Sequence, residues 1–194
     1  MVRLPWRAAA LLAFLLVVRP ADAAPEPHVK AAPPEQSVAL LRDALLHLRP
    51  SVSSRDAARL SQRAHTASHE LAREYRTVGS AHFQNFLVNI GVRKRGLCFQ
   101  WTEDLLRQLY SLHLATLQLR WGTAYERTWR EHNCVVVAAP GQPFSDGIVL
   151  DAWRNSGQLF WARVANDHYR WHEEADPTYF RRATAEESKR ADGR

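Results

Sequence analysis

The spacing of apolar residues in this 194-residue chain changes once, after Leu114, from a helical repeat to an alternating one. Upstream, apolar side chains recur every three or four positions, which is the period of an amphipathic helix. Downstream, short alternating runs are separated by turn clusters rich in Pro, Gly and Asn, and such short connections favour antiparallel strands. Helices followed by strands predict an α+β fold and argue against a doubly wound α/β fold.

The predicted second half is an antiparallel sheet of roughly four strands, against which the helix that opens at Cys98 packs. The helix before it is short, and its spacing places Phe83, Phe86 and Leu87 on the inner face. The predicted helices span 35–48, 55–75 and 82–90 before the one at Cys98, and the predicted strands span 114–121, 131–138, 147–153 and 158–164.

The two ends of the chain are predicted to lie outside the folded domain. Arg3 and Arg7 precede an apolar run over 8–18, and an Ala-x-Ala site ends at Ala23, which is typical of a secretory signal peptide. We therefore expect an exported protein, periplasmic or secreted, with no stable membrane anchor after cleavage. The predicted segments are a signal peptide over 1–23, a proline-rich linker over 24–34, a single domain over 35–177 with its core at 81–164, and a charged tail over 178–194.

The charge of the chain is moderately basic. Lys and Arg number 26 against 20 Asp and Glu; removal of residues 1–23 leaves 23 and 19, so the net charge falls from +6 to +4. A modest positive charge suits an anionic envelope polymer, and the export signal argues against nucleic acid as a partner.

The residues best suited to chemistry lie on either side of the change in periodicity. Cys98 follows a glycine-containing loop and opens a helix, where the macrodipole and unpaired N–H groups favour the thiolate. His132 lies in one predicted strand and Asp151 in the next. A thiol, a histidine and an acid in this order supply a nucleophile, its base and the group that orients the base. The sequence therefore predicts a catalytic site of Cys98, His132 and Asp151.

These residues also resemble a known family. The stretch Gly96 to Cys98, followed by the aromatic Trp101, is similar to the G-x-C-x-x-aromatic element of the transglutaminase-like superfamily. That superfamily is a branch of the papain-like cysteine enzymes and includes exported bacterial proteins. His132 and Asp151 match its histidine and aspartate strands, and the resemblance covers 81–164.

The sequence departs from the family pattern at two places. Asn133 and Cys134 follow the histidine, where a small residue and an aromatic one are usual, and Ala152 follows the aspartate in place of proline.

The resemblance implies a thiol enzyme that cleaves or transfers amide or isopeptide bonds and needs no cofactor. Cys98 attacks the carbonyl, its backbone N–H contributes to the oxyanion site, His132 moves the proton and Asp151 orients the imidazole. Export points to cell-wall peptide or an envelope protein as the substrate. Trp101 and Trp153 are the candidate substrate-binding residues.

Other interpretations of the same side chains stay open. A Cys98–Cys134 disulfide would make a non-catalytic envelope binding domain of the same fold, because Cys134 shares a strand face with His132. Cys98, His132 and Cys134 also match a zinc ligand set, with Asp151 or water completing it. On the long predicted helix, His65 and His69 lie four apart, as a metal pair or as two solvent-facing side chains.

Overall fold

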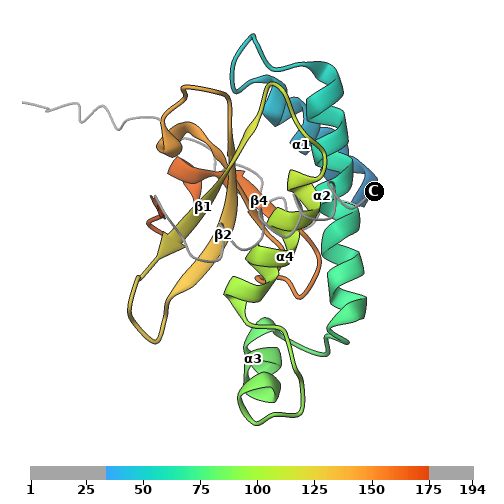
Figure 1. Ribbon diagram of the computed structural model, residues 1–194, viewed down its shortest axis with the longest axis vertical. Coiled ribbons are helices and arrows are strands. Elements are labelled where there is room, and N and C mark those ends of the chain that lie inside the picture. Colours follow the sequence, from blue (N-terminus) through green and yellow to red (C-terminus); the bar gives the residue numbers. More distant parts are fainter. Residues whose placement is uncertain (1–33, 175–194) are drawn as a thin grey trace, which may run out of the picture.

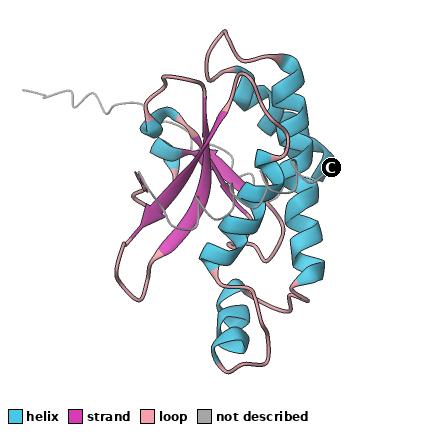
Figure 2. Cartoon of the chain, in the orientation of Figure 1, coloured by secondary structure: helices cyan, strands magenta, loops and turns pink. Residues whose placement is uncertain are grey.

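Helices occupy the first part of the described chain and strands the second, as the change in periodicity predicts (Figure 1, Figure 2). The computed structural model describes residues 34–174, so the predicted signal peptide, nearly all of the linker and the charged tail lie outside the described residues. The fold class is α+β. The elements are α1 (Pro34–Leu46), α2 (Ser54–Glu74), α3 (Ala81–Asn89), α4 (Cys98–Tyr110), β1 (Gln118–Ala124), β2 (His132–Ala138), η2 (Phe144–Asp146), β3 (Ile148–Asp151), β4 (Phe160–Arg163), η3 (Val164–Asn166) and β5 (His172–Glu173).

The described strands form one antiparallel sheet in the order β4-β3-β2-β1-β5. The central strand is β2, in which Val135 pairs with Trp121 of β1 on one side and with Leu150 of β3 on the other. Every residue of β2 is buried. The sheet has one strand more than the roughly four predicted, because β5 is only two residues long and leaves no alternating pattern in the sequence.

The sheet separates a large apolar core from a small one. Helices α1, α2 and α4 lie together on one side (Figure 1), where they pack against Val135 and Leu150. Successive residues of a strand point to opposite faces, so Cys134 and Val136 belong to the small cluster on the other side, with Val149. This division determines which side chains of β2 lie on the same face as α4.

Strand β1 begins at Gln118 and not at the predicted Leu114. The reason lies in the first turn of α2, where Asp56 Oδ2 accepts hydrogen bonds from the backbone N–H groups of Ala115 (3.0 Å) and Thr116 (2.8 Å). Because each residue has a single backbone N–H, these two are unavailable to a strand ladder. Asp56 thereby joins the start of α2 to the connection between α4 and the sheet.

Strand β3 ends at Asp151, although the pattern predicts a strand through Trp153. Asp151 Oδ1 accepts hydrogen bonds from the backbone N–H groups of Trp153 (3.1 Å) and Arg154 (3.0 Å). An aspartate that binds the N–H two residues further on closes a turn, so the carboxylate itself terminates the strand.

Helix α3 presents the opposite face to the one predicted. Phe83 and Phe86 are 47% and 54% exposed, so the prediction that they point inward is wrong. The buried residues are Ala81 and Gln84, and the Gln84 amide donates a hydrogen bond to the Tyr75 carbonyl at 3.3 Å. A polar contact therefore sets the orientation of this short helix, whereas apolar spacing alone favoured the phenylalanine face.

His65 and His69 do not form a pair. His69 is exposed, whereas His65 is 6% exposed and lies between α1 and α2. Both ring nitrogens of His65 are bonded: Nδ1 lies 2.9 Å from the Ser61 carbonyl and Nε2 lies 2.9 Å from Ser37 Oγ. Trp161 Nε1 donates to the same hydroxyl at 3.0 Å, so the imidazole helps to join both helices to strand β4.

We expect this histidine to make the fold sensitive to mild acid. Burial lowers the pKa of His65 below 6.5, so the unfolded chain binds a proton more readily than the folded chain. The resulting loss of folding stability is absent above pH 6.5 and grows as the pH falls below that value. Urea unfolding at pH 7 and pH 5 should show a smaller loss of stability for His65→Gln than for the wild type, while His69→Gln should follow the wild type. If the free energy of unfolding changed equally with pH in the wild type and both variants, this role of His65 would be contradicted.

Candidate active site

The start of helix α4 is fixed by hydrogen bonds from its own first turn. Gln100 Oε1 accepts from the backbone N–H groups of Gly96 (2.8 Å) and Leu97 (3.0 Å). Gly96 has a φ of +141°, and a Cβ at this position would lie 2.8 Å from Cγ of the buried Gln84. Cys98 is the first residue of the helix, so its backbone N–H lies outside the intrahelical ladder.

The Cys98 sulfur lies at the beginning of strand β2 and is partly exposed. The thiol contacts the Glu131 carbonyl at 3.6 Å and Asn133 Oδ1 at 3.8 Å, both at distances of weak hydrogen bonds. Asn133 is itself held by its amide nitrogen, which donates to Thr123 Oγ1 at 3.2 Å. The nucleophile candidate therefore lies against the strand that carries His132.

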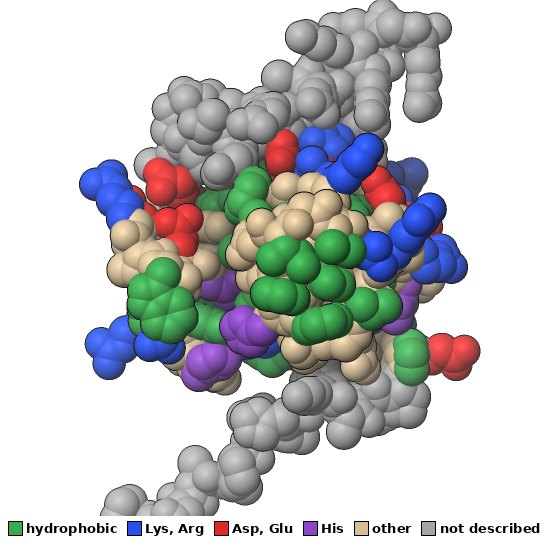
Figure 3. Space-filling model, turned by 90° about the horizontal axis from the view of Figure 1, so that it is seen from below, with side chains coloured by type: hydrophobic (Ala, Val, Ile, Leu, Met, Phe, Trp, Pro, Cys, Tyr) green, Lys and Arg blue, Asp and Glu red, His purple; other side chains and the backbone are tan. Residues whose placement is uncertain are grey.

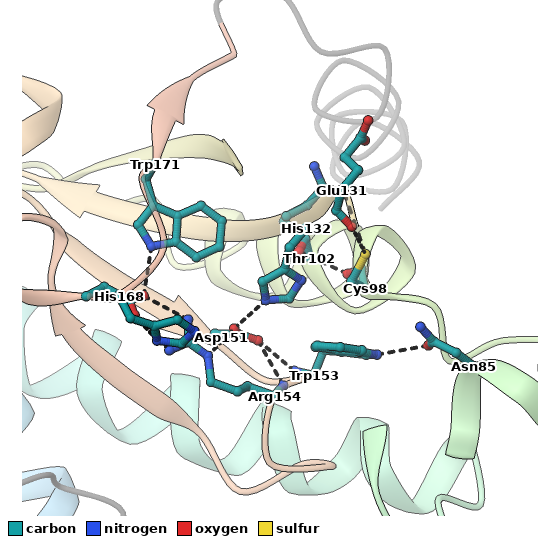
Figure 4. A network of polar contacts seen from close by, with 12 residues as sticks. Asn85, Cys98, Thr102, Glu131, His132, Asp151, Trp153, Arg154, His168 and Trp171 are labelled. Atoms are coloured by element: carbon teal, nitrogen blue, oxygen red, sulfur yellow. Dashed lines mark hydrogen bonds and ion pairs between the residues drawn. The ribbon is translucent and has the colours of Figure 1, made fainter. Parts of the chain in front are cut away.

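His132 lies between Asp151 and Cys98 (Figure 4). Its Nε2 is 2.7 Å from Asp151 Oδ2, and the side chain is almost fully buried. Its Nδ1 is also buried and has no hydrogen-bond partner of good geometry within residues 34–174. The Cys98 thiol nevertheless interacts with the ring, because it contributes to the raised pKa of the imidazole. The structure thus brings the three predicted residues together, with one ring nitrogen bonded to the acid and the other available.

Charge interactions outweigh burial at both members of the buried pair. Burial alone would lower the pKa of His132, but the Asp151 carboxylate, by charge and hydrogen bond, and the Cys98 thiol raise it to about 9. Burial alone would raise the pKa of Asp151, but His132 and Arg154 lower it to about 2. The imidazole is therefore protonated at neutral pH, with a proton on each ring nitrogen.

The Asp151 carboxylate belongs to a larger network that the sequence did not reveal. Arg154 Nε donates to Asp151 Oδ2 at 2.9 Å, and the same guanidinium forms two bonds to Asp167 at 2.8 and 2.9 Å. Trp171 Nε1 also donates to Asp167, at 2.8 Å. No local pattern marks these residues, because the contacts connect a turn after β3 with a segment beyond β4.

Aromatic rings enclose the imidazole. The ring centroids of Trp153, Tyr169 and Trp171 lie 4.7, 4.9 and 5.4 Å from that of His132. Such packing restricts the orientation of the imidazole and excludes water from its faces.

The two candidate substrate-binding tryptophans have different environments. Trp101 is 1% exposed, and its Nε1 donates to the Gly96 carbonyl at 3.2 Å, so it is a core residue with no surface for a substrate. Trp153 is also largely buried, but it packs beside His132 and donates from Nε1 to Asn85 Oδ1 at 3.0 Å. By contrast, Trp129 is 93% exposed in the β1–β2 connection, close in sequence to the Glu131 carbonyl that contacts Cys98.

The alternative roles of the cysteines are not supported. Both thiols are free. Cys134 does share a strand face with His132, but Cys98 approaches from the end of β2, and Cys134 packs on the face away from α4. Burial raises the pKa of the Cys134 thiol well above its usual value. Within the described part of the chain, no group of three or more His, Cys, Asp or Glu side chains is arranged to hold a metal ion.

Comparison with protein-family models, with curated proteins and with solved structures finds no match for this chain. The transglutaminase-like resemblance therefore rests on the residues and their arrangement alone. Between residues 34 and 174, no helix combines the length and the apolar content needed to cross a membrane.

Proposed function

We propose that this protein is a thiol enzyme that cleaves or transfers amide or isopeptide bonds, with a site of the transglutaminase-like kind. The observation that carries the proposal is the order of contacts around His132. Asp151 binds Nε2 at 2.7 Å, Nδ1 is left without a bonded partner, and a partly exposed thiol at a helix start interacts with the same ring.

The proposed reaction has two half-steps. The Cys98 thiolate attacks the substrate carbonyl and forms a C–S bond, and the carbonyl oxygen becomes an oxyanion. As the C–N bond breaks, the proton on His132 Nδ1 passes to the leaving amine. The neutral Nδ1 then takes a proton from water for hydrolysis, or from a second amine for transfer, and the acyl group leaves the sulfur. Asp151 holds the ring so that Nδ1 remains the reacting nitrogen.

In the proposed reaction two amide groups stabilise the oxyanion. The Cys98 backbone N–H is one, because it is not used within the helix. Asn133 is the other: rotation of its side-chain amide by 180° points Nδ2 at the sulfur, while Thr123 Oγ1, which donates as well as accepts, keeps its hydrogen bond. In this rotated form, the departure from the family pattern at Asn133 supplies a donor for the proposed oxyanion.

The proposed substrate is cell-wall peptide or an envelope protein, in keeping with the export predicted from the sequence. In support, the β1–β2 connection beside Cys98 carries Trp129, which is 93% exposed, and Tyr125, which is 40% exposed. Arg130 stacks over both of these rings. An aromatic and basic loop of this kind suits an extended peptide that bears a carboxylate.

The proposal is tested by trapping the acyl-enzyme. Mixing the protein with p-nitrophenyl acetate should release a burst of p-nitrophenol of about one per chain, and peptide mass spectrometry should find the acetyl group on Cys98. The buried Cys134 is expected to stay unmodified, and Cys134→Ser should keep the burst. Adding a primary amine then distinguishes the two reactions, because transfer yields the acetylated amine and hydrolysis yields acetate. Acetylation that is equal at both cysteines, or absent from both, would favour a non-catalytic binding domain.

A further inference from the structure

Helix α3 and the turns beside it expose apolar side chains that the catalytic proposal does not use. We call this surface the α3 patch; it is formed by Val78, Phe83, Phe86, Ile90 and Val92, each 46–56% exposed. The two phenylalanine rings are stacked with centroids 6.2 Å apart. Figure 3, which views the molecule from the end where α3 lies in Figure 1, shows apolar side chains gathered into one area with Lys and Arg side chains beside it. A contiguous apolar area of this kind marks an interaction site.

The segment that carries the patch has charged side chains of one sign only. From Arg76 to Thr102 the sequence contains no Asp or Glu, although the chain as a whole has 20 of them. Arg93 and Lys94 lie in the same stretch, and Arg76 and Lys94 are exposed. A hollow of about 480 Å³ adjoins the patch; its lining consists of Glu74, Tyr75, Arg76, Val92, Arg93, Lys94 and Arg95. The single carboxylate in that lining, Glu74, comes from the end of α2.

We infer that the α3 patch docks reversibly on an anionic lipid surface. Phenylalanine and aliphatic side chains bind at the boundary of headgroups and acyl chains, and neighbouring Lys and Arg side chains attract anionic headgroups. The patch combines the apolar side chains of α3 with Arg76, Arg93 and Lys94 in the segments on either side of that helix. Such docking is a peripheral association and differs from a membrane anchor.

A second copy of this chain fits the patch less well. In a two-fold symmetric dimer the same surface meets itself, so Arg76 and Lys94 of one copy would face the equivalent cations of the other with no acidic residue from 76–102 between them. Anionic headgroups supply the missing opposite charge.

The docking surface borders the candidate active site. On α3, Asn85 accepts a hydrogen bond from Trp153 Nε1 at 3.0 Å, and His82 packs edge-to-face with the same indole at 5.3 Å. Trp153 in turn packs on His132 (Figure 4). A protein docked through α3 therefore holds the site next to the lipid surface. The docking inference itself stands on the patch and its charge and does not depend on catalysis.

Hydroxyl-radical labelling of the full chain tests the contact at single side chains. Without lipid, Phe83 and Phe86 should be oxidised; phosphatidylglycerol vesicles should lower their oxidation, and phosphatidylcholine vesicles should do so much less. Tyr110, which is 38% exposed at the end of α4 opposite to Cys98, reports the radical dose. Vesicle flotation should show Phe83→Ser/Phe86→Ser partitioning about tenfold or more weakly, and Lys94→Glu losing the preference for phosphatidylglycerol. Leu40→Ser on α1, at a residue 41% exposed, should float like the wild type.

Several results would overturn the inference. Oxidation of Phe83 and Phe86 that vesicles leave unchanged would show that lipid does not cover the patch. If Phe83 and Phe86 were protected from oxidation without vesicles, another part of the chain would cover the patch. If that protection grew with protein concentration, a second copy of the chain would cover it. Equal flotation of the serine variant and the wild type would place the lipid contact elsewhere.

Discussion

Replacing His132 with alanine is expected to slow acyl-enzyme formation at Cys98 by about 10²–10⁴-fold. The variant lacks the imidazolium that pairs with the attacking Cys98 thiolate in the proposed reaction. Because p-nitrophenolate leaves without a proton donor, the burst reports this loss alone. Stopped-flow measurement of the p-nitrophenol burst gives the rate. His69→Ala is the matched control, because that histidine is exposed on α2, outside the candidate site. A His132→Ala variant that reacts within about threefold of the wild type would remove the imidazole from the mechanism.

The same site should show a characteristic pH dependence on an amide substrate. His132 has a pKa of about 9, so the protonated imidazole that donates to the leaving amine is lost as the pH rises through about 9. The second-order rate constant should therefore fall above that pH. The Asp151 carboxylate is a main cause of the raised pKa, so Asp151→Asn should move this fall to lower pH. If the rate constant of Asp151→Asn fell at the same alkaline pH as that of the wild type, Asp151 would not be a cause of the raised pKa of His132.

Replacing Arg154 with methionine is expected to destabilise the fold by about 3–5 kcal/mol. The guanidinium lies between two carboxylates, Asp151 and Asp167, whose side chains are each 1% exposed. Removing it leaves the Asp167 carboxylate without its main charged partner and leaves Asp151 with His132 as its remaining cation. Urea unfolding at pH 7 measures the loss. The exposed pair Arg42–Asp43 on α1 provides the control, because Arg42→Met should cost at most about 1 kcal/mol.

A second variant separates buried charge from lost packing, since Arg154 also lies over the Phe160 ring at 3.7 Å. If uncompensated charge dominates, Arg154→Met/Asp167→Asn should recover part of the stability. The response to acid provides a further check. Asp151 has its pKa lowered to about 2, so its contribution is present above pH 3.8 and is lost between pH 3.8 and about 2. Arg154→Met should reduce that acid-dependent loss, because the pKa of Asp151 rises without the guanidinium. A double variant no more stable than Arg154→Met would assign the loss to packing.

Local patterns in the sequence determined the elements that carry the candidate site. The helical repeat predicted that Cys98 opens a helix, and α4 begins at that residue. Alternation predicted strands at His132 and Asp151, and both lie in neighbouring strands of the antiparallel sheet. These predictions succeeded because residues a few positions apart decide whether a segment can bury one face of a helix or of a strand.

Two of the errors lie where a polar contact with another segment overrode a local pattern. The backbone N–H groups of Ala115 and Thr116 donate hydrogen bonds to the Asp56 carboxylate, so these residues do not extend β1. Gln84 is buried against Tyr75, which leaves Phe83 and Phe86 exposed. Apolar spacing shows which residues share one face of a helix or strand. It does not show which face packs against the rest of the protein.

The sequence by itself determined the fold class, the helix that begins at Cys98 and the strands that present His132 and Asp151. Only the tertiary structure decided that Cys134 lies on the far side of the sheet, and that Asp167 reaches Asp151 through Arg154. The physical reason is one of range. Helix and strand periods are properties of neighbouring residues, whereas the pairing of buried charges and the covering of each face depend on segments that meet only after the chain has folded.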